Sequence, residues 1–350
     1  MQRERHRWDP VCEPPRDLFR PVPVDPTGRD GPTRGQAAGP SWRRTGRGLY
    51  VPSSVDADVP EQRILEQSMR LTSGGAVTGW ASGRMHGASF FDGRRLDGRP
   101  IPVPLACGPL HQIRRLPGDD LHRDTLLDHE IEMILGIPCT TVDRAAFDAM
   151  RFAPTVRHAV VNMDVMAAAG LTSINRMTEY LVPHRAWTGV PMCRDALGLA
   201  DEGSRSPPET RLRLVWMLDA ARPRPLANPP VFDLDGQLLG YPDLLDPEAG
   251  VVGEYDGEDH RDALRHSSDV RRESAFRDHD LEMFRVTGPD MRNPQLVVER
   301  IRSAYRRARR VPPDRRTWTL VPPPWWPTPL SLDDQLALRE LTGQPFDAAS

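Results

Sequence analysis

The first half of the chain contains segments whose apolar residues recur at helical spacing. In residues 60–71, which begin with proline, Ile64, Leu65 and Met69 share one face of a predicted helix. The other elements predicted in this half are strands at 47–55 and 101–108 and helices at 76–87, 140–152, 155–170, 173–181 and 193–200. Together these elements predict one α+β domain over residues 56–200.

A polar stretch at 201–209 is typical of an exposed linker, and shorter elements follow it. They are predicted as a helix at 206–221, strands at 230–235, 238–245 and 250–256, a helix at 267–280, a strand at 281–287 and a helix at 294–310. Strands that alternate with helices in this way indicate a compact α+β or α/β unit over residues 204–310. We expect helices to flank the sheet of this unit.

Both ends of the chain lack a sustained period. Residues 1–48 are rich in Pro, Gly and Arg, so we expect an arm or irregular lobe within residues 1–55. Residues 311–350 form a Pro-rich tail with one short helix. Trp325 and Trp326 of this tail resemble a base-stacking platform, but docking of the tail on the protein's own surface is the favoured interpretation.

Composition narrows the chemistry. Proline accounts for 37 of 350 residues, about twice the usual share. The chain has no lysine, so all 46 basic residues are arginines. This excludes a phosphate-binding loop of the GKS or GKT type and a Schiff-base lysine. Contacts to anions must therefore use guanidinium groups.

Charge, cysteine spacing and apolar runs further narrow the possible partners, metal sites and location of the protein. The net charge is −3, but residues 1–50 and 297–317 are basic. The four cysteines show no zinc-site spacing. The N-terminus does not resemble a secretory signal, and no apolar run approaches 18 residues, so we expect a cytoplasmic protein without a membrane partner.

The segment LLGYPDLLDPEAGVVGEYDGEDH holds the acids that suggest a reaction. The turn signal DPEAG between two extended runs predicts a β-hairpin. Side chains alternate along a strand, so Glu254 and Asp256 share one face. A four-residue loop (246–249) places Asp243 opposite Val252 and on the same face, whereas a five-residue loop places it on the other face.

Three carboxylates on one strand face repel one another unless a cation or protons compensate. Mg²⁺ or Mn²⁺ suits this set, since Mg²⁺ takes one or two carboxylates, keeps waters and bridges to phosphate oxygens. We therefore predict that Asp243, Glu254 and Asp256 bind the metal for hydrolysis of a phosphodiester. His260 is a candidate proton shuttle, and Arg272 a candidate phosphate ligand.

These residues also carry a family resemblance. The stretch SPPETRLRL…LGYPDLLDPEAGVVGEYDG..H…D..R…L…RV resembles the very-short-patch-repair-like endonucleases of the PD-(D/E)XK superfamily, and more closely an actinobacterial group of proteins with such a domain. That group shows S-x-x-E on a first helix, Asp on the second strand, E-x-D-G-x-x-H on the third and D-x-x-R on a helix. The match covers residues 204–287 and implies a restriction-endonuclease-like mixed sheet, Mg²⁺ and a DNA partner.

The resemblance assigns roles residue by residue. The catalytic residues that it implies are Asp243, Glu254, Asp256, His260 and Glu209, and the helix pair is Asp269 and Arg272. The lysine of the wider superfamily's E-x-K motif is replaced here by Asp256. The source of positive charge in the transition state is therefore open.

A second resemblance lies upstream. RGLYVP, AVTGWASGRMHG and GIPCTTVDRAAFDAMR resemble the middle part of AbiEi-type antitoxin or regulator proteins, in which a winged helix-turn-helix comes first. Residues 31–52 hold that place here, but they contain too much Gly and Pro for a good recognition helix. This predicts a degenerate wing, and the resemblance implies a toxin–antitoxin or repair partner.

Several candidates have a purely structural alternative. Ser206 and Glu209 have the spacing of a capping box. His260 suits a surface turn, and Asp269 and Arg272 suit an ordinary helix pair.

The basic run near the end of the predicted domain also has two alternative roles. Arg306 and Arg307 are candidates to contact a DNA backbone, with a solvated helix face as the alternative.

Two main functions follow from the sequence. The first is a metal-dependent DNA endonuclease. The second is a non-catalytic nucleic-acid-binding or antitoxin-like regulator that keeps a nuclease fold, and a plain interaction protein is a third. Convergence of Asp243, Glu254 and Asp256 on one metal ion would favour the first.

Overall fold

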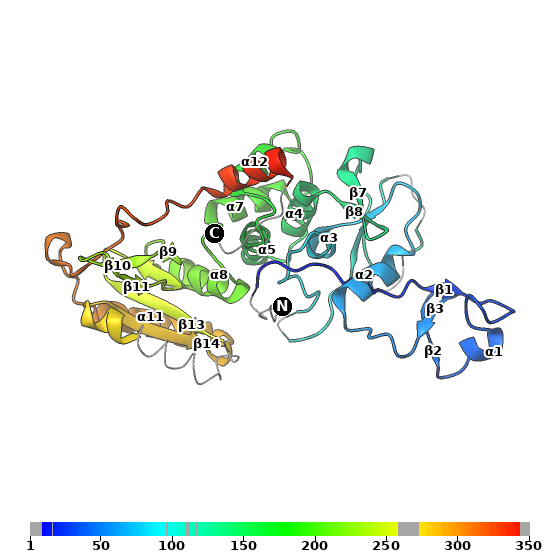
Figure 1. Ribbon diagram of the computed structural model, residues 1–350, viewed down its shortest axis with the longest axis horizontal. Coiled ribbons are helices and arrows are strands. Elements are labelled where there is room, and N and C mark those ends of the chain that lie inside the picture. The colour runs from blue at the N-terminus through cyan, green and yellow to red at the C-terminus, as the bar shows by residue number, and fades with distance from the viewer. Residues whose placement is uncertain are drawn as a thin grey trace. The chain divides into compact units, whose positions relative to one another are not determined.

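The computed structural model describes residues 9–15, 17–95, 97–109, 113–115, 118–257 and 273–343. The chain forms two compact units, Met1–Leu197 with a segment that starts at Arg339, and Gly198–Leu338 (Figure 1). Both units combine helices with mixed β-sheets, so the mixed α/β character predicted from the sequence is confirmed.

The first unit begins with a small antiparallel sheet in the order β1-β3-β2. Its elements are β1 (Val22–Pro23), α1 (Arg34–Ala37), β2 (Trp42–Gly46) and β3 (Leu49–Pro52). Arg43 forms a bidentate ion pair with Glu66 of α2 (Pro60–Ser68), with N–O distances of 2.9 and 2.8 Å. Within the segment predicted to be irregular, residues 22–23, 34–37 and 42–46 instead form β1, α1 and β2, because the two strands pair with β3.

A five-stranded mixed sheet in the order β6-β5-β4-β8-β7 forms the centre of the first unit. Its strands are β4 (Ala76–Val77), β5 (Pro104–Ala106), β6 (Asp120–His122), β7 (Ile131–Ile134) and β8 (Ile137–Thr140). Of the helix predicted at 76–87, the first two residues form strand β4, and the helix α3 (Gly79–Met85) begins only after them. The first two residues extend because they are fully buried and pair with both β5 and β8.

The remaining helices of the first unit agree with the sequence prediction to within a few residues. They are α4 (Val142–Arg151), α5 (Val156–Ala168), α6 (Ile174–Tyr180) and α7 (Val190–Leu199). A 3₁₀ turn, η1 (Asp128–Glu130), was not predicted. Side-chain caps explain where two of them begin, since Thr155 accepts from the amide of His158 and Ser173 accepts from that of Arg176.

A four-stranded sheet in the order β14-β13-β12-β9 forms the centre of the second unit. Its strands are β9 (Leu226–Ala227), β12 (Leu244–Asp246), β13 (Val251–Asp256) and β14 (Glu282–Thr287). β12 and β13 form the predicted antiparallel hairpin, whereas β13 and β14 are parallel. Residues 273–278, in the connection between the parallel strands, are helical.

A second, three-stranded sheet has the order β11-β10-β15. Its strands are β10 (Val231–Asp233), β11 (Leu238–Gly240) and β15 (Trp318–Thr319). The single strand predicted at 238–245 is wrong, because β11 and β12 belong to different sheets. Gly240 has φ of 150°, and Pro242 cannot donate a hydrogen bond to a ladder, so the extended run is interrupted between them.

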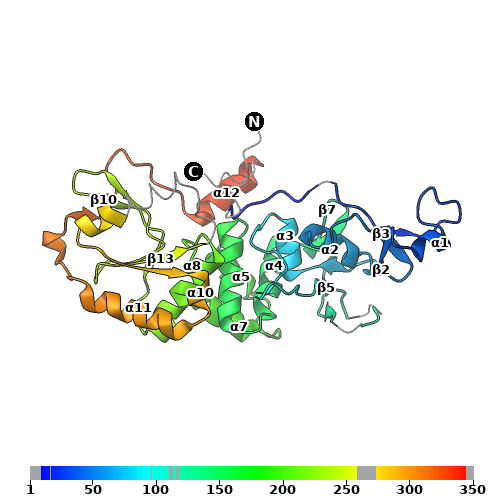
Figure 2. The same cartoon turned by 90° about the horizontal axis from the view of Figure 1, so that it is seen from below.

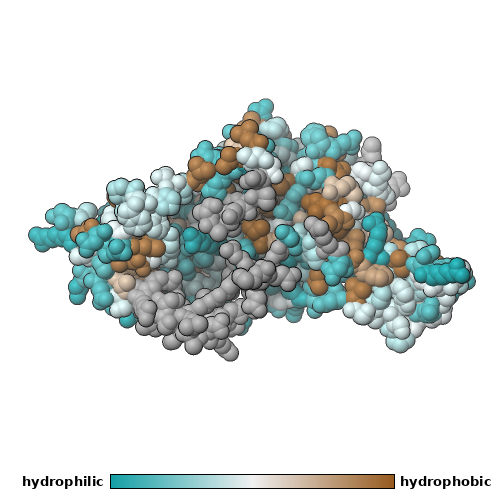
Figure 3. Space-filling view, viewed as in Figure 1, coloured by the Kyte–Doolittle hydropathy of each residue, from teal (hydrophilic) through white to brown (hydrophobic). Residues whose placement is uncertain are grey.

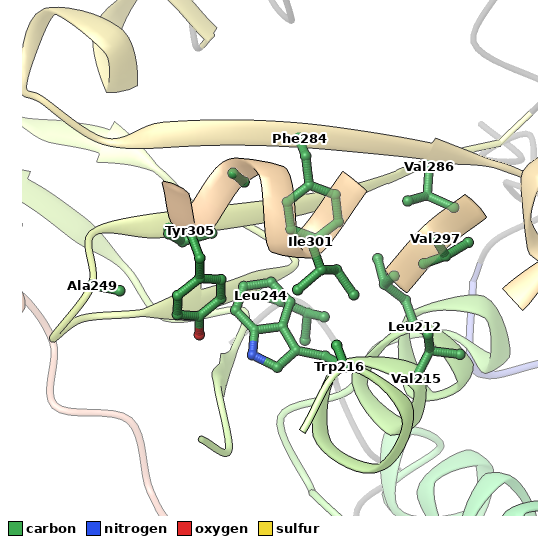
Figure 4. Close-up of a cluster of buried hydrophobic side chains, with 13 residues drawn as sticks. Leu212, Val215, Trp216, Leu244, Ala249, Phe284, Val286, Val297, Ile301 and Tyr305 are labelled. Atoms are coloured by element: carbon green, nitrogen blue, oxygen red, sulfur yellow. The ribbon is translucent and has the colours of Figure 1, made fainter. Parts of the chain in front are cut away.

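Helices cover one face of the four-stranded sheet (Figure 2). They are α8 (Pro207–Leu214), which continues as a π-helical turn (Val215–Asp219), and α11 (Pro294–Arg307), which follows the short α10 (Gly288–Met291). Figure 4 shows Phe284 and Val286 of β14 pointing toward Ile301 and Val297 of α11, with Trp216 beside them. The opposite face packs on a separate cluster that includes Phe276 and Trp318.

The tight packing around β13 leads to a stability prediction. A methyl group at Gly253 would lie 2.7 Å from Phe284 Cζ and 3.0 Å from Trp216 Cζ3. We expect Gly253→Ala to lower the free energy of unfolding by about 1–3 kcal/mol through overpacking. Urea denaturation measures this change.

A second glycine provides the control. A methyl group at Gly198, in α7, would meet no atom within 4 Å. Gly198→Ala should therefore be neutral or stabilising by up to about 1 kcal/mol, because alanine favours helix. Equal losses in the two variants would contradict the packing described around β13.

The tail after α11 packs partly on its own unit. It contains a 3₁₀ turn (Pro313–Arg315), β15 and, beyond an extended stretch, α12 (Leu332–Thr342). The ring of Trp326 meets buried Phe232 edge-on at a centroid distance of 4.9 Å, so docking of the tail is confirmed for this residue. Trp325 is 64% exposed.

Hydrophobic residues reach the surface in separate patches in the view of Figure 3. In the described ranges, no helix combines the length and apolar character needed to cross a membrane.

Candidate functional site

The hairpin of β12 and β13 brings Asp243 and Glu254 together. Asp246 pairs with Val251, so the loop has four residues, 247–250, and not the predicted 246–249. Continuing this register by one residue places Asp243 opposite Glu254. The amide of Tyr255 donates to Asp243 Oδ2 at 2.7 Å, which holds the carboxylate beside β13.

Glu254 and Asp256 lie on the sheet face that α8 and α11 leave uncovered. Val252 belongs to the cluster on that face, and alternation places both acids on the same side. They also lie toward the carboxyl ends of the parallel strands β13 and β14. Open α/β sheets bind ligands at such ends.

The acids differ in their exposure to solvent. Glu254 is only 4% exposed, whereas the side chain of Asp256 is 37% exposed. An ionised carboxylate as buried as Glu254 requires compensation by hydrogen bonds or cations. Asp256 has enough accessible surface to meet a ligand.

Arg285 is a neighbour of these acids. The sequence motif includes it only as the arginine of the final RV pair and gives it no role. It pairs in parallel register with Glu254, so both side chains project from the same face. Its Nη1 lies 4.0 Å from Asp256 Oδ2, and its Nη2 lies 3.2 Å from Glu273 Oε2. The predicted strand at 281–287 contains Arg285, but its register with β13 could not be read from the sequence.

Glu209 lies in the first turn of α8, which Ser206 caps, but its carboxylate accepts from the Arg205 amide and not from the Ser206 amide of a capping box. Its backbone amide donates to Ser206 Oγ, and its carboxylate accepts from the Ser206 hydroxyl at 2.8 Å and from the Arg205 amide at 2.9 Å. Asn228 donates to the same carboxylate at 2.7 Å. A structural role for Glu209 is therefore present, and it is compatible with a further role for this acid.

Asn228 links the helix acid to the strand acid. Its side-chain amide donates to Glu209 Oε2 and to the carbonyl of Gly203, and its backbone amide donates to the carbonyl of Asp243 at 3.1 Å. Its φ of 50° is a left-handed conformation that Asn tolerates better than most residues. The sequence signal was the turn-forming Asn-Pro-Pro run that begins at this residue.

This link can be tested by two substitutions. We expect Asn228→Gly to lower the free energy of unfolding by about 1–3 kcal/mol, because the Glu209 carboxylate loses a donor. Asn228→Ala should lower the free energy of unfolding by about 1 kcal/mol more, because alanine disfavours the positive φ. Urea denaturation should rank wild type above Gly and Gly above Ala. An unchanged glycine variant would rule out the stabilising link.

The predicted DNA-contacting arginines lie elsewhere in the second unit. Arg306 and Arg307 are exposed residues of α11, which packs on the sheet face opposite to the acids. Arg307 forms an ion pair of 2.6 Å with Glu282, the first residue of β14, whereas Asp256 lies beside its last residue. The structure therefore does not bring these arginines to the acids.

Three further predicted residues lie outside the described residues. They are His260, Asp269 and Arg272.

The candidate metal ligands, Asp243, Glu254 and Asp256, offer carboxylate oxygens. These are hard ligands of the type that Mg²⁺ and Mn²⁺ prefer. Within the described ranges, no group of three or more His, Cys, Asp or Glu side chains is arranged to hold a metal ion. Mg²⁺ needs only one or two protein carboxylates when waters and substrate phosphates complete its shell. Asp243 and Glu254, which face each other in the hairpin register, fit this smaller requirement.

Asp246 is a buried acid with a different task. It accepts from the amides of Glu248 and Ala249 in the hairpin loop and from the hydroxyl of Tyr305 on α11. Burial raises the pKa of Tyr305, and the hydrogen bond to Asp246 raises it further. These contacts fix the hairpin turn against α11 and so support the register of β12 and β13.

The first unit contains a buried charged network that the sequence analysis also missed. Arg144 pairs with Glu130 and Asp148, each at 3.0 Å, and Arg151 pairs with Asp148 at 2.7 Å. Both guanidinium groups also lie over the ring of Trp187. Burial opposes ionisation of Glu130, but hydrogen bonds and Arg144 outweigh it and lower its pKa. The network joins α4 to neighbouring elements.

Comparison of the chain with protein-family models, curated proteins and solved structures gives no match.

Proposed function

We propose that the protein is a metal-dependent DNA endonuclease of the very-short-patch-repair-like type. The observation that carries this proposal is the hairpin register. Continued by one residue, it places Asp243 opposite Glu254, on the same sheet face as Asp256. Carboxylates gathered at the carboxyl ends of parallel strands suit metal-assisted hydrolysis of a phosphodiester.

The order of elements supports a restriction-endonuclease-like fold for the second unit. Helix α8 precedes the β12–β13 hairpin, and a connection with helical residues 273–278 leads to the parallel strand β14 and then to α11. The resemblance to the PD-(D/E)XK superfamily implies the same order, with acids on the first helix and on the second and third strands.

The proposed site has distinct roles for its residues. Asp243 and Glu254 would hold Mg²⁺ or Mn²⁺, with Asp256 as a further ligand or a group that orients water. When bound, the metal polarises the phosphate and lowers the pKa of water. Glu209 holds the start of α8 beside the strands through Asn228. His260 would move a proton.

DNA is the proposed partner. Arg272 would contact a phosphate near the site, and Arg306 and Arg307 would contact a more distant part of the backbone. The upstream resemblance to AbiEi-type proteins adds a toxin–antitoxin or repair partner for the first unit.

One observation favours a second candidate function, a nucleic-acid-binding or antitoxin-like regulator without cleavage. The described residues contain no three-member group of potential ligands arranged for a metal ion. In that case, the second unit would keep a nuclease fold as a scaffold.

The response of DNA binding to salt and metal distinguishes the two functions. A regulator would bind duplex DNA in EDTA with an affinity that falls steeply with salt, and it would leave the DNA intact when Mg²⁺ is added. An endonuclease would convert the same duplex to product when Mg²⁺ is added. Intact DNA in Mg²⁺ and Mn²⁺ would reject the endonuclease proposal.

A further inference from the structure

Beside the metal and Arg272, the proposed function names no described residue that stabilises the charge of the transition state. Negative charge grows on the non-bridging oxygens of the phosphate as the nucleophile attacks, and a fixed cation stabilises it. The chain contains no lysine, and Asp256 occupies the position at which the wider superfamily has one. Arginine is therefore the side chain of this sequence that carries a permanent positive charge.

We propose that Arg285 binds a non-bridging oxygen of the scissile phosphate and stabilises its charge in the transition state. This inference rests on the proposed endonuclease function. It names a residue on β14, outside the hairpin that carries the acids.

The strand register places Arg285 at the acids. Its Cα partner on β13 is Glu254, and its Nη1 lies 4.0 Å from Asp256 Oδ2. This distance exceeds hydrogen-bond range, so the two groups attract each other without a direct hydrogen bond. The side chain is 41% exposed and is therefore accessible to a substrate.

Glu273 holds the guanidinium in place. Its Oε2 lies 3.2 Å from Arg285 Nη2, and its Oε1 lies 2.5 Å from Arg277 Nη2. One carboxylate is therefore shared by two arginines. Glu273 holds Nη2, while Nη1 lies 4.0 Å from Asp256 Oδ2 and keeps donors of the kind that bind phosphate.

The chemistry requires no proton from Arg285. A water oxygen forms a bond to phosphorus while the bond from phosphorus to the leaving sugar oxygen breaks. The proton of the water passes to a base or solvent, and the leaving oxygen gains a proton. Arg285 remains a cation throughout, since guanidinium does not deprotonate in proteins.

The test compares the full-length wild type with Arg285→Gln, Arg285→Lys and Arg277→Gln. Arg277→Gln is the matched control, because it removes an equal charge and a pair with the same Glu273 from a side chain that is 66% exposed. The substrates are a supercoiled plasmid and duplex, mismatched, nicked and single-stranded oligonucleotides. Single-turnover rates in Mg²⁺ are measured beside binding of a labelled oligonucleotide in Ca²⁺ and thermal unfolding.

We expect Arg285→Gln to reduce the single-turnover rate by about 10²-fold, a typical result of removing one donor to a developing oxyanion. Binding in Ca²⁺ and the unfolding temperature should stay close to those of Arg277→Gln. Arg285→Lys should recover at least about tenfold of the loss, because it restores the charge.

Two contrary results are distinguishable. If the wild type cleaves and Arg285→Gln cleaves as fast as Arg277→Gln, Arg285 does not stabilise the transition state and the inference alone is wrong. The inference also fails if Arg285→Gln loses rate only in proportion to its loss of DNA binding. If the wild type cleaves none of these substrates, the proposed function fails and the inference falls with it.

Discussion

Replacing Glu254 by glutamine is expected to abolish metal-dependent DNA cleavage, with a loss of at least about 10³-fold in rate. The substitution keeps the shape of a side chain that is only 4% exposed but removes the charge that would hold the metal. Because a buried charge is costly, the neutral amide should leave the unfolding temperature unchanged or raise it. Single-turnover cleavage measures the loss of rate, and calorimetry measures the loss of Mn²⁺ binding. Thermal unfolding checks the fold.

Glu248→Gln is the matched control for this prediction. Glu248 is an exposed residue of the same hairpin, in the loop at its other end. The control should cleave DNA like the wild type. A Glu254→Gln variant that cleaves as fast as Glu248→Gln would remove Glu254 from the site.

Replacing Arg144 by leucine is expected to lower the free energy of unfolding of the first unit by about 3–5 kcal/mol. The Arg144 side chain is fully buried, and its removal leaves the carboxylates of Glu130 and Asp148 without their shared cation. Asp148 would still pair with Arg151, so Glu130 should suffer the greater loss. Urea denaturation followed by tryptophan fluorescence measures the change.

An exposed arginine provides the comparison for the buried network. Arg99 is 82% exposed and lies 3.6 Å from Asp97. Arg99→Leu should cost less than about 1 kcal/mol, as exposed ion pairs usually do. If Arg144→Leu is no more destabilising than Arg99→Leu, the network does not stabilise the first unit.

The sequence predicts the elements of the site better than their arrangement. Alternation along 250–256 and the DPEAG turn suffice to predict the hairpin. They leave a four- and a five-residue loop open, and only the register of the strands places Asp243 on the face of Glu254. The loop starts one residue later than predicted. Because a shift of one residue in each strand keeps the parity of the pairing, the acids remain on the same face.

Features that depend on contacts between distant residues could not be predicted. Arg285 meets Glu254 through a parallel register set by packing in the core, and no local pattern specifies that register. The interruption at Pro242 separates β11 from β12, although the hydrophobic pattern predicts one strand over both. From the sequence, Arg144 is expected on the polar, exposed face of an amphipathic helix. Its burial follows from the contact with Glu130, fourteen residues earlier, which no local pattern predicts.

The most direct test of the central claim is cleavage of DNA by the purified full-length protein. The substrates are plasmid, duplex, mismatched, nicked and single-stranded DNA, incubated with Mg²⁺, Mn²⁺ or EDTA, with Glu254→Gln beside the wild type. The carboxylate site predicts cutting that requires a divalent cation and disappears in the variant. DNA that stays intact in both metals, or cutting that persists in EDTA or in the variant, would contradict it.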